Sequence, residues 1–277
     1  AVANIILDPL FIFGLDMGVT GAALATVISQ FLSAVWVFAF LTGRQTLVRL
    51  RIAHMKIAVQ RLKKIVGLGL SGFMMQATNS VVQIACNNTL QAYGGDLYVS
   101  VMTVMTSIRE IFNMPVQGMT NAAQPVISFN YGAGDYDRVR RAIAFMSAFC
   151  VASCLLFWFL IIMFPAFFVR IFNNEPAMVE ASVNAIHIYF FGRFLMALQS
   201  AGQSVFVALG KAKRAVFFSI FRKIIIVVPL TLILPRFMGI NGVFVAEPIS
   251  NLIGGAACYI TMLCTVLPEL KRKEGRG

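Results

Sequence analysis

Charged side chains are scarce in this chain of 277 residues: Asp, Glu, Lys and Arg make up 12% of it. Apolar residues make up 59%, and the mean hydropathy is +0.81. A water-soluble domain typically carries about 25% charged residues, so this chain has too few charges to cover a surface in contact with water. The shortage excludes an ordinary soluble domain and predicts an integral membrane protein.

Histidine and cysteine are also sparse, and neither is spaced for a metal site. The two histidines, His54 and His187, lie in separate segments without a carboxylate partner at ligand spacing. The five cysteines include no C-x-x-C pair, and all fall in or beside apolar stretches, as small packing residues do. We therefore expect no cofactor, structural metal or disulfide.

Catalytic and nucleic-acid-binding signatures are missing as well. No H-E-x-x-H or G-x-S-x-G motif and no pair of catalytic carboxylates is present, which argues against a membrane enzyme. The net charge of +12 comes mostly from short clusters between apolar stretches, not from a basic helix. We therefore expect the lipid bilayer, and no nucleic acid, as a partner.

What the chain has is a series of long apolar runs, which predict an all-α protein with eight membrane-spanning helices. The expected spans are residues 1–14, 20–42, 65–92, 97–129, 142–169, 181–209, 215–234 and 242–267. The fourth is long, and we expect Pro115 and Pro125 to kink or break it. The first run begins without an initiator Met or a signal-peptide pattern, so we expect a fragment that is cut within a helix.

Basic residues in the connections alternate between the two sides of the membrane. One side has seventeen, whereas the other has only Arg170 and Arg236. By the positive-inside rule the first side is the cytoplasm, and the plasma membrane is the expected location. The seventeen are Arg44, Arg49, Arg51, Lys56, Arg61, Lys63, Lys64, Arg138, Arg140, Arg141, Lys211, Lys213, Arg214, Lys271, Arg272, Lys273 and Arg276.

The second and eighth spans are related by an internal repeat with a spacing of 221 residues. The matching pairs are Gly18 and Gly239, Gly21 and Gly242, Ala25 and Ala246, Ile28 and Ile249, and Ser29 and Ser250. Parallel repeats of this kind predict a transporter with two lobes of six helices in the intact protein. Residues 1–42 would then be the last two helices of the first lobe and 65–267 the second lobe, with 43–64 a basic cytoplasmic link and 268–277 a cytoplasmic tail.

Four stretches resemble the multidrug and toxic compound extrusion (MATE) family: NIILDPLFIFG at 4–14, GVTGAALATVISQ at 18–30, QPVISFNYGAGDYDRVRRA at 124–142 and GINGVFVAEPISN at 239–251. The resemblance implies an antiporter driven by H⁺ or Na⁺ that expels amphipathic, often cationic, small molecules by alternating access. It also implies that the first four helices of the family are absent here. A monomer is expected.

A carboxylate, Asp8, stands within the first apolar run, one helical turn after Asn4. Such a group costs about 2.5 to 3.5 kcal/mol on insertion scales, so it should face the interior and have a partner. The resemblance implies that Asn4, Asp8 and Thr26 belong to the first-lobe site for the coupling ion, H⁺ or Na⁺. The alternative is that Asp8 caps a helix broken at Pro9.

Polar residues recur at helical spacing in the third and fourth spans and predict a wet cavity or a lobe interface. Interhelical hydrogen bonding is an equally ordinary use of the amides. At Gln76 some family members carry an acidic residue, so the resemblance does not supply a complete second-lobe ion site. The expected substrate cavity consists of Glu110, which would attract cations, Asn113, Gln117, Gln76, Asn79 and Gln83.

The 221-residue repeat places Glu247 opposite Thr26, which suggests a secondary protonatable group in the second lobe. The alternative is that Glu247 accepts a hydrogen bond near a kink at Pro248.

A flippase for lipid-linked saccharide, which shares the general architecture, is the alternative function. It would be expected to collect cations in its cavity for the phosphate. The spans contain only Arg109, Arg193, Arg222 and Lys223, and the last two lie close enough to the cytoplasmic end to snorkel. The charge distribution therefore favours the antiporter.

Overall fold

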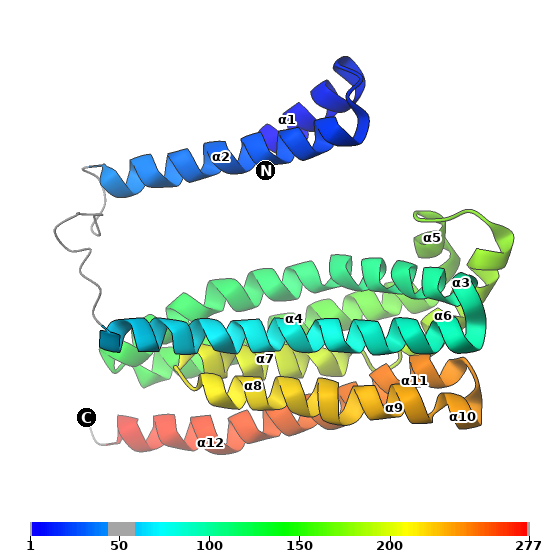
Figure 1. Cartoon of the computed structure of the whole chain (residues 1–277). Coiled ribbons are helices and arrows are strands. Elements are labelled where there is room, and N and C mark those ends of the chain that lie inside the picture. The colour runs from blue at the N-terminus through cyan, green and yellow to red at the C-terminus, as the bar shows by residue number, and fades with distance from the viewer. Residues whose placement is uncertain (1, 44–58, 276–277) are drawn as a thin grey trace. The chain divides into compact units, whose positions relative to one another are not determined.

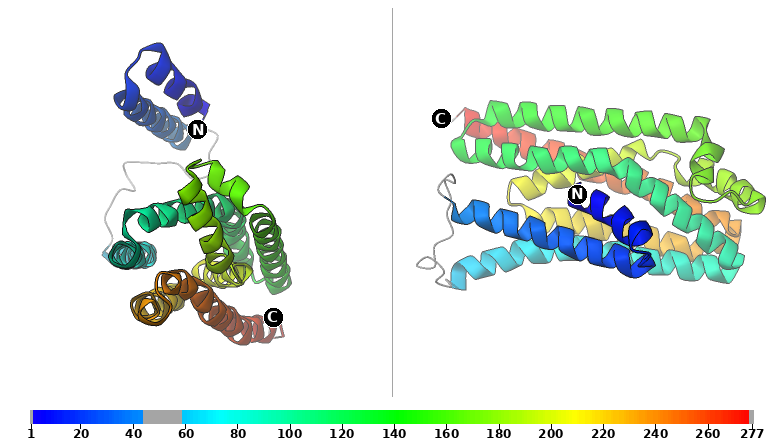
Figure 2. Two further views of the ribbon diagram at one scale, coloured as in Figure 1. Left: turned by 90° about the vertical axis from the view of Figure 1, so that its right-hand side faces the viewer. Right: turned by 90° about the horizontal axis from the view of Figure 1, so that it is seen from above.

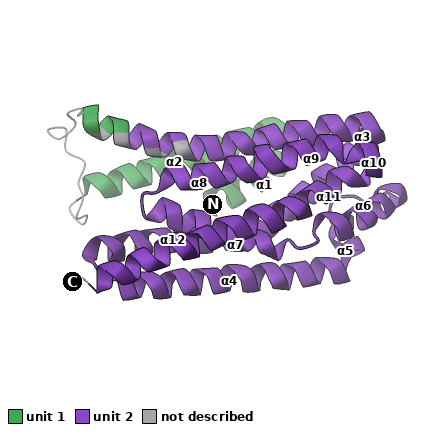
Figure 3. Cartoon of the chain, turned by 90° about the horizontal axis from the view of Figure 1, so that it is seen from below, with its two compact units in different colours: residues 1–64 green, residues 65–277 purple. Residues whose placement is uncertain are grey.

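The computed structural model of the chain describes residues 2–43 and 59–275, so most of the predicted link between the lobes lies outside the described residues. Within the described ranges the regular elements are all helices, which confirms the all-α prediction. The chain divides into two compact units, residues 1–64 and 65–277 (Figure 3).

Unit 1 is a helical hairpin. Helix α1 (Val2–Pro9) continues as a π-helical segment, η1 (Leu10–Gly14), and after a short turn the chain returns as α2 (Gly18–Thr42) (Figure 1). These elements match the expected spans 1–14 and 20–42. The outward face of α2 is apolar, with Trp36 and Phe31 exposed, as a helix in contact with lipid or with further helices requires.

Helix α3 (Val59–Ala133) starts in the last residues of unit 1 and continues into unit 2, and it consists of two helices joined at Gly95. Gly95 has φ 66°, a conformation that residues with a Cβ rarely adopt, and the chain turns back there (Figure 1). The two arms match the expected spans 65–92 and 97–129. The prolines do not break the helix, because α3 runs through Pro115 and Pro125, as membrane helices can. A kink at these prolines stays a prediction.

The remaining helices of unit 2 lie alongside one another (Figures 1 and 2). A bend of 57° separates α6 from α7, so this pair forms one broken span where a single helix at 181–209 was expected. With that pair counted once, six segments of the described chain are long and apolar enough to span a membrane, and α3 contributes two arms to one of them. The segment Val2–Gly14 is a shorter apolar helix, so the helix count agrees roughly with the eight expected spans. The elements are α4 (Tyr136–Met163), α5 (Pro165–Arg170), α6 (Pro176–Tyr189), α7 (Phe194–Ala208), α8 (Ala212–Ile220), η3 (Phe221–Val227), α9 (Val228–Ile233), α10 (Pro235–Met238), α11 (Asn241–Ser250), η4 (Asn251–Gly255) and α12 (Ala256–Glu274).

Apolar side chains fill the interior of unit 2 and also cover its outside. One buried cluster surrounds Phe112 and Phe190, and a second surrounds Phe206 and Met262. Large apolar residues such as Phe145, at 67% exposure, and many others point outward. A continuous exposed apolar surface is stable in lipid and not in water, so the chain is a multi-pass membrane protein.

The internal repeat has the same structural role in both copies. Gly18 and Gly239 have positive φ values of 54° and 58° and turn the chain into α2 and α11. Three residues later, Gly21 and Gly242 lie so close to the preceding segment that an added Cβ would be 2.8 Å from the Phe11 carbonyl oxygen and 2.5 Å from the Leu234 carbonyl carbon. Each G-x-x-G therefore combines a turn with a tight helix crossing.

The basic connections of unit 2 meet at one end of the bundle. Lys211 at the start of α8 and Lys273 on α12 both pair with Glu269, and Lys273 also donates to the Tyr131 hydroxyl at 2.6 Å. The turn at Gly95 and the segment between α4 and α6 lie at the opposite end (Figure 1). This arrangement agrees with the alternation of basic charge along the sequence.

Candidate functional site

In unit 1 the carboxylate and amide of α1 form a pair. The Asn4 amide nitrogen donates a hydrogen bond to Asp8 Oδ1 at 3.1 Å, and both side chains are half-buried. The capping alternative is wrong, because α1 runs through Asp8 to Pro9 and η1 continues directly from it. Asp8 is thus an intrahelical carboxylate whose hydrogen-bond partner is neutral.

Thr26 does not join this pair in unit 1. Its hydroxyl donates to the Ala22 carbonyl oxygen of its own helix at 3.0 Å, and the residue is exposed. Gly21 and Ala25 are the buried residues of α2. Within the described part of the chain, no hydrogen bond links Thr26 to Asn4 or Asp8, so its assignment to the ion site stays a prediction.

Unit 2 contains two adjoining cavities, of about 470 and 300 Å³. Volumes of this size suit a small organic ligand. The residues that both cavities share are Asn79, Arg109, Arg222, Lys223 and Glu247. The predicted residues lie here: Gln76, Asn79, Glu110, Asn113 and Gln117 line the larger cavity, and Gln83 lines the smaller one.

The cavity-lining amides of α3 hydrogen-bond mainly along their own helix. The Asn79 amide donates to Gln76 Oε1 at 3.1 Å, and the Gln83 amide donates to Asn87 Oδ1 at 3.4 Å. Each pair leaves further donors and acceptors facing the cavity. The geometry therefore fits a wall that adapts to different ligands.

Two π-helical segments carry cavity cations and a hydrogen-bond partner of one of them. Arg222 and Lys223 are on η3, and Asn251 is on η4. Wider turns of this kind occur often at functional sites, because they redirect side chains that a regular helix would point elsewhere. Gly254 makes the necessary room, since an added Cβ there would be 2.7 Å from Cγ of Arg222.

Arg222 and Glu247 form a buried ion pair at 3.2 Å, with 5% and 10% of their side chains exposed. The same guanidinium nitrogen donates to Asn251 Oδ1 at 2.8 Å. The expectation that Arg222 and Lys223 snorkel toward the cytoplasm is wrong, because both line the cavity and Arg222 is held there by Glu247 and Asn251. Glu247 is therefore more than an acceptor near a proline kink.

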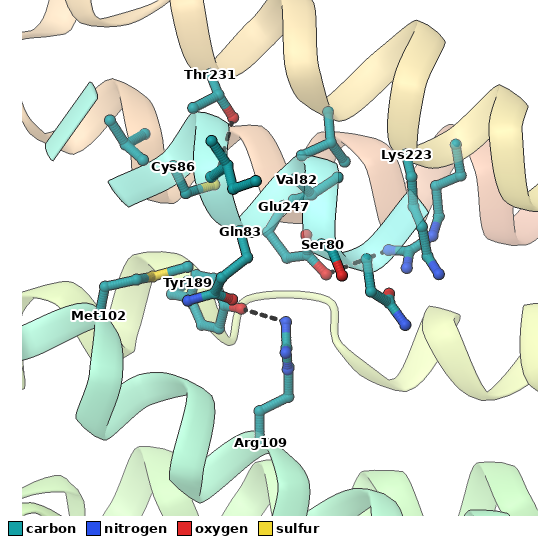
Figure 4. A pocket seen from close by; sticks show the side chains of 15 residues that line it. Ser80, Val82, Gln83, Cys86, Met102, Arg109, Tyr189, Lys223, Thr231 and Glu247 are labelled. Carbon is teal, nitrogen blue, oxygen red and sulfur yellow. Dashed lines mark hydrogen bonds and ion pairs between the residues drawn. The ribbon is translucent and has the colours of Figure 1, made fainter. Parts of the chain in front are cut away.

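Arg109 approaches the cavity from the second arm of α3 (Figure 4). It donates to the Tyr189 hydroxyl at 3.2 Å and pairs with Glu110 at 3.3 Å. Glu110 has 54% of its side chain exposed. Figure 4 shows Arg109 directed toward Tyr189, with Glu247 and Lys223 on the other side of the pocket.

Two further cations have neutral partners. Arg193, in the break between α6 and α7, donates to Asn113 Oδ1 at 2.8 Å and lies over the Phe190 ring at 5.6 Å. Lys223 Nζ donates to the Met75 carbonyl oxygen at 3.1 Å. The sequence identified the four cations in the spans, but it did not show that Arg109, Arg222 and Lys223 line the same cavity. A sequence signal for the bend that positions Arg193 is Gly192, a glycine in the middle of an apolar span. In the structure Gly192 has φ 66°.

A helical membrane bundle with a polar, charged cavity at its centre defines the class of a membrane transporter. A family model described as MatE matches residues 72–233, more than half of the chain. The chain therefore belongs to the MatE family, the multidrug and toxic compound extrusion transporters that the four sequence stretches resemble.

Curated relatives and solved structures agree with this assignment. The chain is 23% identical over 265 residues to the multidrug export protein MepA of Staphylococcus aureus (strain bovine RF122 / ET3-1), covering 95% of this chain and 57% of the relative. It is 21% identical to MepA of Staphylococcus saprophyticus, covering 94% and 58%. A crystal structure of MATE in complex with MaL6 superposes with a TM-score of 0.89 at 22% identity, covering 98% of this chain and 61% of that one. The chain thus spans a little over half the length of the curated relatives it matches.

These comparisons bear on the two functions left open by the sequence. Arg109, Arg222 and Lys223 line the cavity, so a lack of cavity cations does not count against a flippase, contrary to the expectation from the sequence. The chain belongs to the MatE family, and the relatives named above are multidrug export proteins.

Proposed function

We propose that this protein is a secondary active multidrug efflux transporter of the plasma membrane, which exchanges H⁺ or Na⁺ for amphipathic compounds by alternating access. The observation that carries the proposal is the Asn4–Asp8 pair, a carboxylate with a neutral partner inside an apolar helix of a MatE-family chain. Carboxylate and amide oxygens are suitable ligands for Na⁺, and a carboxylate in an apolar setting can also take up H⁺.

In this scheme the two units have different tasks. Asp8 in unit 1, with Asn4 and Thr26, exchanges the coupling ion. The cavity of unit 2 holds the transported compound against the amides of α3, and Glu247 is a secondary protonatable group. The oxygen-rich site of unit 1 and the larger, mixed cavity of unit 2 suit these two kinds of ligand.

Drug export by the full-length protein in proteoliposomes, with H⁺ and Na⁺ gradients imposed separately, tests the proposal. One gradient should drive export and thereby identify the coupling ion.

Asp8→Asn keeps the shape of the side chain but removes its charge, so this variant should bind substrate and fail to export it against a gradient. Asp16→Asn, which removes a carboxylate from the turn after η1, is the matched control and should export normally. Gradient-driven export by Asp8→Asn at the wild-type rate would contradict the assignment.

A further inference from the structure

The charges around the cavity of unit 2 do not balance. Arg109, Arg222 and Lys223 line it, and Arg193 is connected to it through Asn113. The carboxylates at this place are Glu110 and Glu247. The other carboxylates in the described part of unit 2 belong to helix ends and their connections: Asp96, Asp135, Asp137, Glu175, Glu180, Glu269 and Glu274. The cavity region therefore carries two more positive charges than negative ones.

Both carboxylates of the cavity are already used in ion pairs, whereas two of the cations have no ion-pair partner among the described residues. Glu110 pairs with Arg109 and Glu247 pairs with Arg222. Lys223 and Arg193 bond to a carbonyl and an amide oxygen, which accept a hydrogen bond without neutralising a charge. A cation away from bulk water is costly until an anion joins it, so the site is prepared for negative charge.

Hydrogen-bond donors are also left over in this region. An ammonium group has three donors, and Lys223 uses one of them on Met75. Arg222 Nε and one terminal nitrogen of Arg193 are buried and have no hydrogen-bond partner within the described residues. Oxygens of a carboxylate, sulfonate or phosphate are the groups that such donors bind most strongly.

We propose that this cavity binds the anionic group of an amphipathic compound, a carboxylate, sulfonate or phosphate, with Lys223 as its principal contact. The ammonium group is the unpaired cation that lines both adjoining cavities. The apolar body of the compound would contact Val82, Met102 and Val243 in the smaller cavity. This inference rests on the proposed function in that it specifies the charge of the exported compound.

Binding measurements test the inference without transport. Fluorescein and rhodamine 123 share a three-ring body but carry opposite charge, and fluorescence polarisation can follow each dye on the full-length protein in phosphatidylcholine nanodiscs. Fluorescein should bind more tightly. Lys223→Gln should lower its affinity by about tenfold, the value of one charge-assisted hydrogen bond, and leave rhodamine 123 unchanged. Lys213→Gln, which removes an exposed lysine from the same segment, is the control and should change neither affinity.

Two further measurements identify the source of the anionic group and test whether a loss of binding comes from misfolding. Displacement of fluorescein by added phosphatidylglycerol would assign the site to a lipid headgroup, and the absence of displacement would assign it to a soluble anion. Lys223→Arg keeps the charge and should keep fluorescein binding. Equal or tighter binding of rhodamine 123 to the wild type, or equal loss of both dyes in a stably folded Lys223→Gln, would overturn the inference. Loss of gradient-driven export with intact fluorescein selectivity would refute the proposed function and leave this inference standing.

Discussion

At the scale of single residues, the three intramembrane carboxylates differ in their hydrogen-bond or ion-pair partners. The partner of each one indicates its role. Asp8 is paired with the neutral Asn4 amide, whereas Glu110 and Glu247 are paired with arginines. An arginine already compensates the charge that a proton or Na⁺ would neutralise, and an amide does not. Ion exchange is therefore expected at Asp8 before Glu247, although the repeat places Glu247 opposite Thr26.

Replacement of Glu247 by Gln should lower stability rather than only change coupling. The variant leaves Arg222 buried without its counter-charge, which typically costs about 3 to 5 kcal/mol of folding free energy. Arg222→Gln/Glu247→Gln should recover much of this loss, because it removes both charges. Thermal unfolding in detergent would compare the single and double variants. A single variant as stable as the wild type, with an altered pH dependence of export, would favour the protonatable role instead.

The Arg109 pair changes what is expected of Glu110. A free carboxylate in the cavity would attract cations, but this one lies 3.3 Å from Arg109. Glu110→Gln releases that guanidinium, so fluorescein affinity should rise by roughly threefold, as the loss of a half-exposed ion pair permits. Asn113→Asp, which adds a carboxylate beside Arg193, should have the opposite effect. A fall in rhodamine 123 affinity alone, with no gain for fluorescein, would restore the cation-attracting role.

At the scale of helices, composition and apolar run length were sufficient to predict an all-α membrane protein and the approximate positions of its helices, since a membrane span requires about 20 apolar residues whatever the packing. They were not sufficient for the breaks. Pro115 and Pro125 are strong helix-breaking signals that α3 tolerates, whereas Gly95 and Gly192 are weaker signals at which the chain does turn. Tertiary contacts decide between these outcomes, and a single sequence does not contain them.

The cavity could be predicted only in part, because its shape also depends on tertiary contacts. Helical spacing predicted Gln76, Asn79, Asn113 and Gln117 as cavity residues, and all four line the larger cavity. Their role in substrate binding stays a prediction. The prediction that Arg222 and Lys223 snorkel was wrong because their positions depend on η3 and η4. The π-helical turns of these segments direct Arg222 toward Glu247 and Asn251. A regular 3.6-residue period does not predict that rotation.

The two helix crossings of the repeat provide a test at the element scale. Gly21→Ala and Gly242→Ala should each destabilise the protein by about 1 to 3 kcal/mol, because the new Cβ would press on backbone atoms that cannot move aside. Gly118→Ala is the control. It lies within α3 with no atom near the added Cβ, so it should be neutral or stabilising by up to about 1 kcal/mol. Unfolding midpoints in detergent would show the difference, and equal effects at all three positions would argue against tight crossings.

At the scale of the whole molecule, the distribution of charge over the two ends of unit 2 predicts its orientation in the membrane. One end holds the basic residues of α4, α8 and α12, which pair with Glu269 and Glu274. At the opposite end, where α5 and α10 lie (Figure 1), the described cations are Arg170 and Arg236. Cations on short connections are retained in the cytoplasm during insertion. The basic end, with the predicted tail 268–277, is therefore expected inside the cell.

Labelling of introduced cysteines in intact cells tests this orientation. Gly275→Cys, after the end of α12, should react with a membrane-impermeant maleimide only when the membrane is permeabilised. Asn174→Cys, exposed between α5 and α6 at the opposite end, should react in intact cells. The unmodified protein provides the background for its five free cysteines, of which Cys264 is exposed on the bundle surface. Reaction of Gly275→Cys in intact cells would reverse the orientation, and with it the direction in which the cavity of unit 2 must open to release an exported compound.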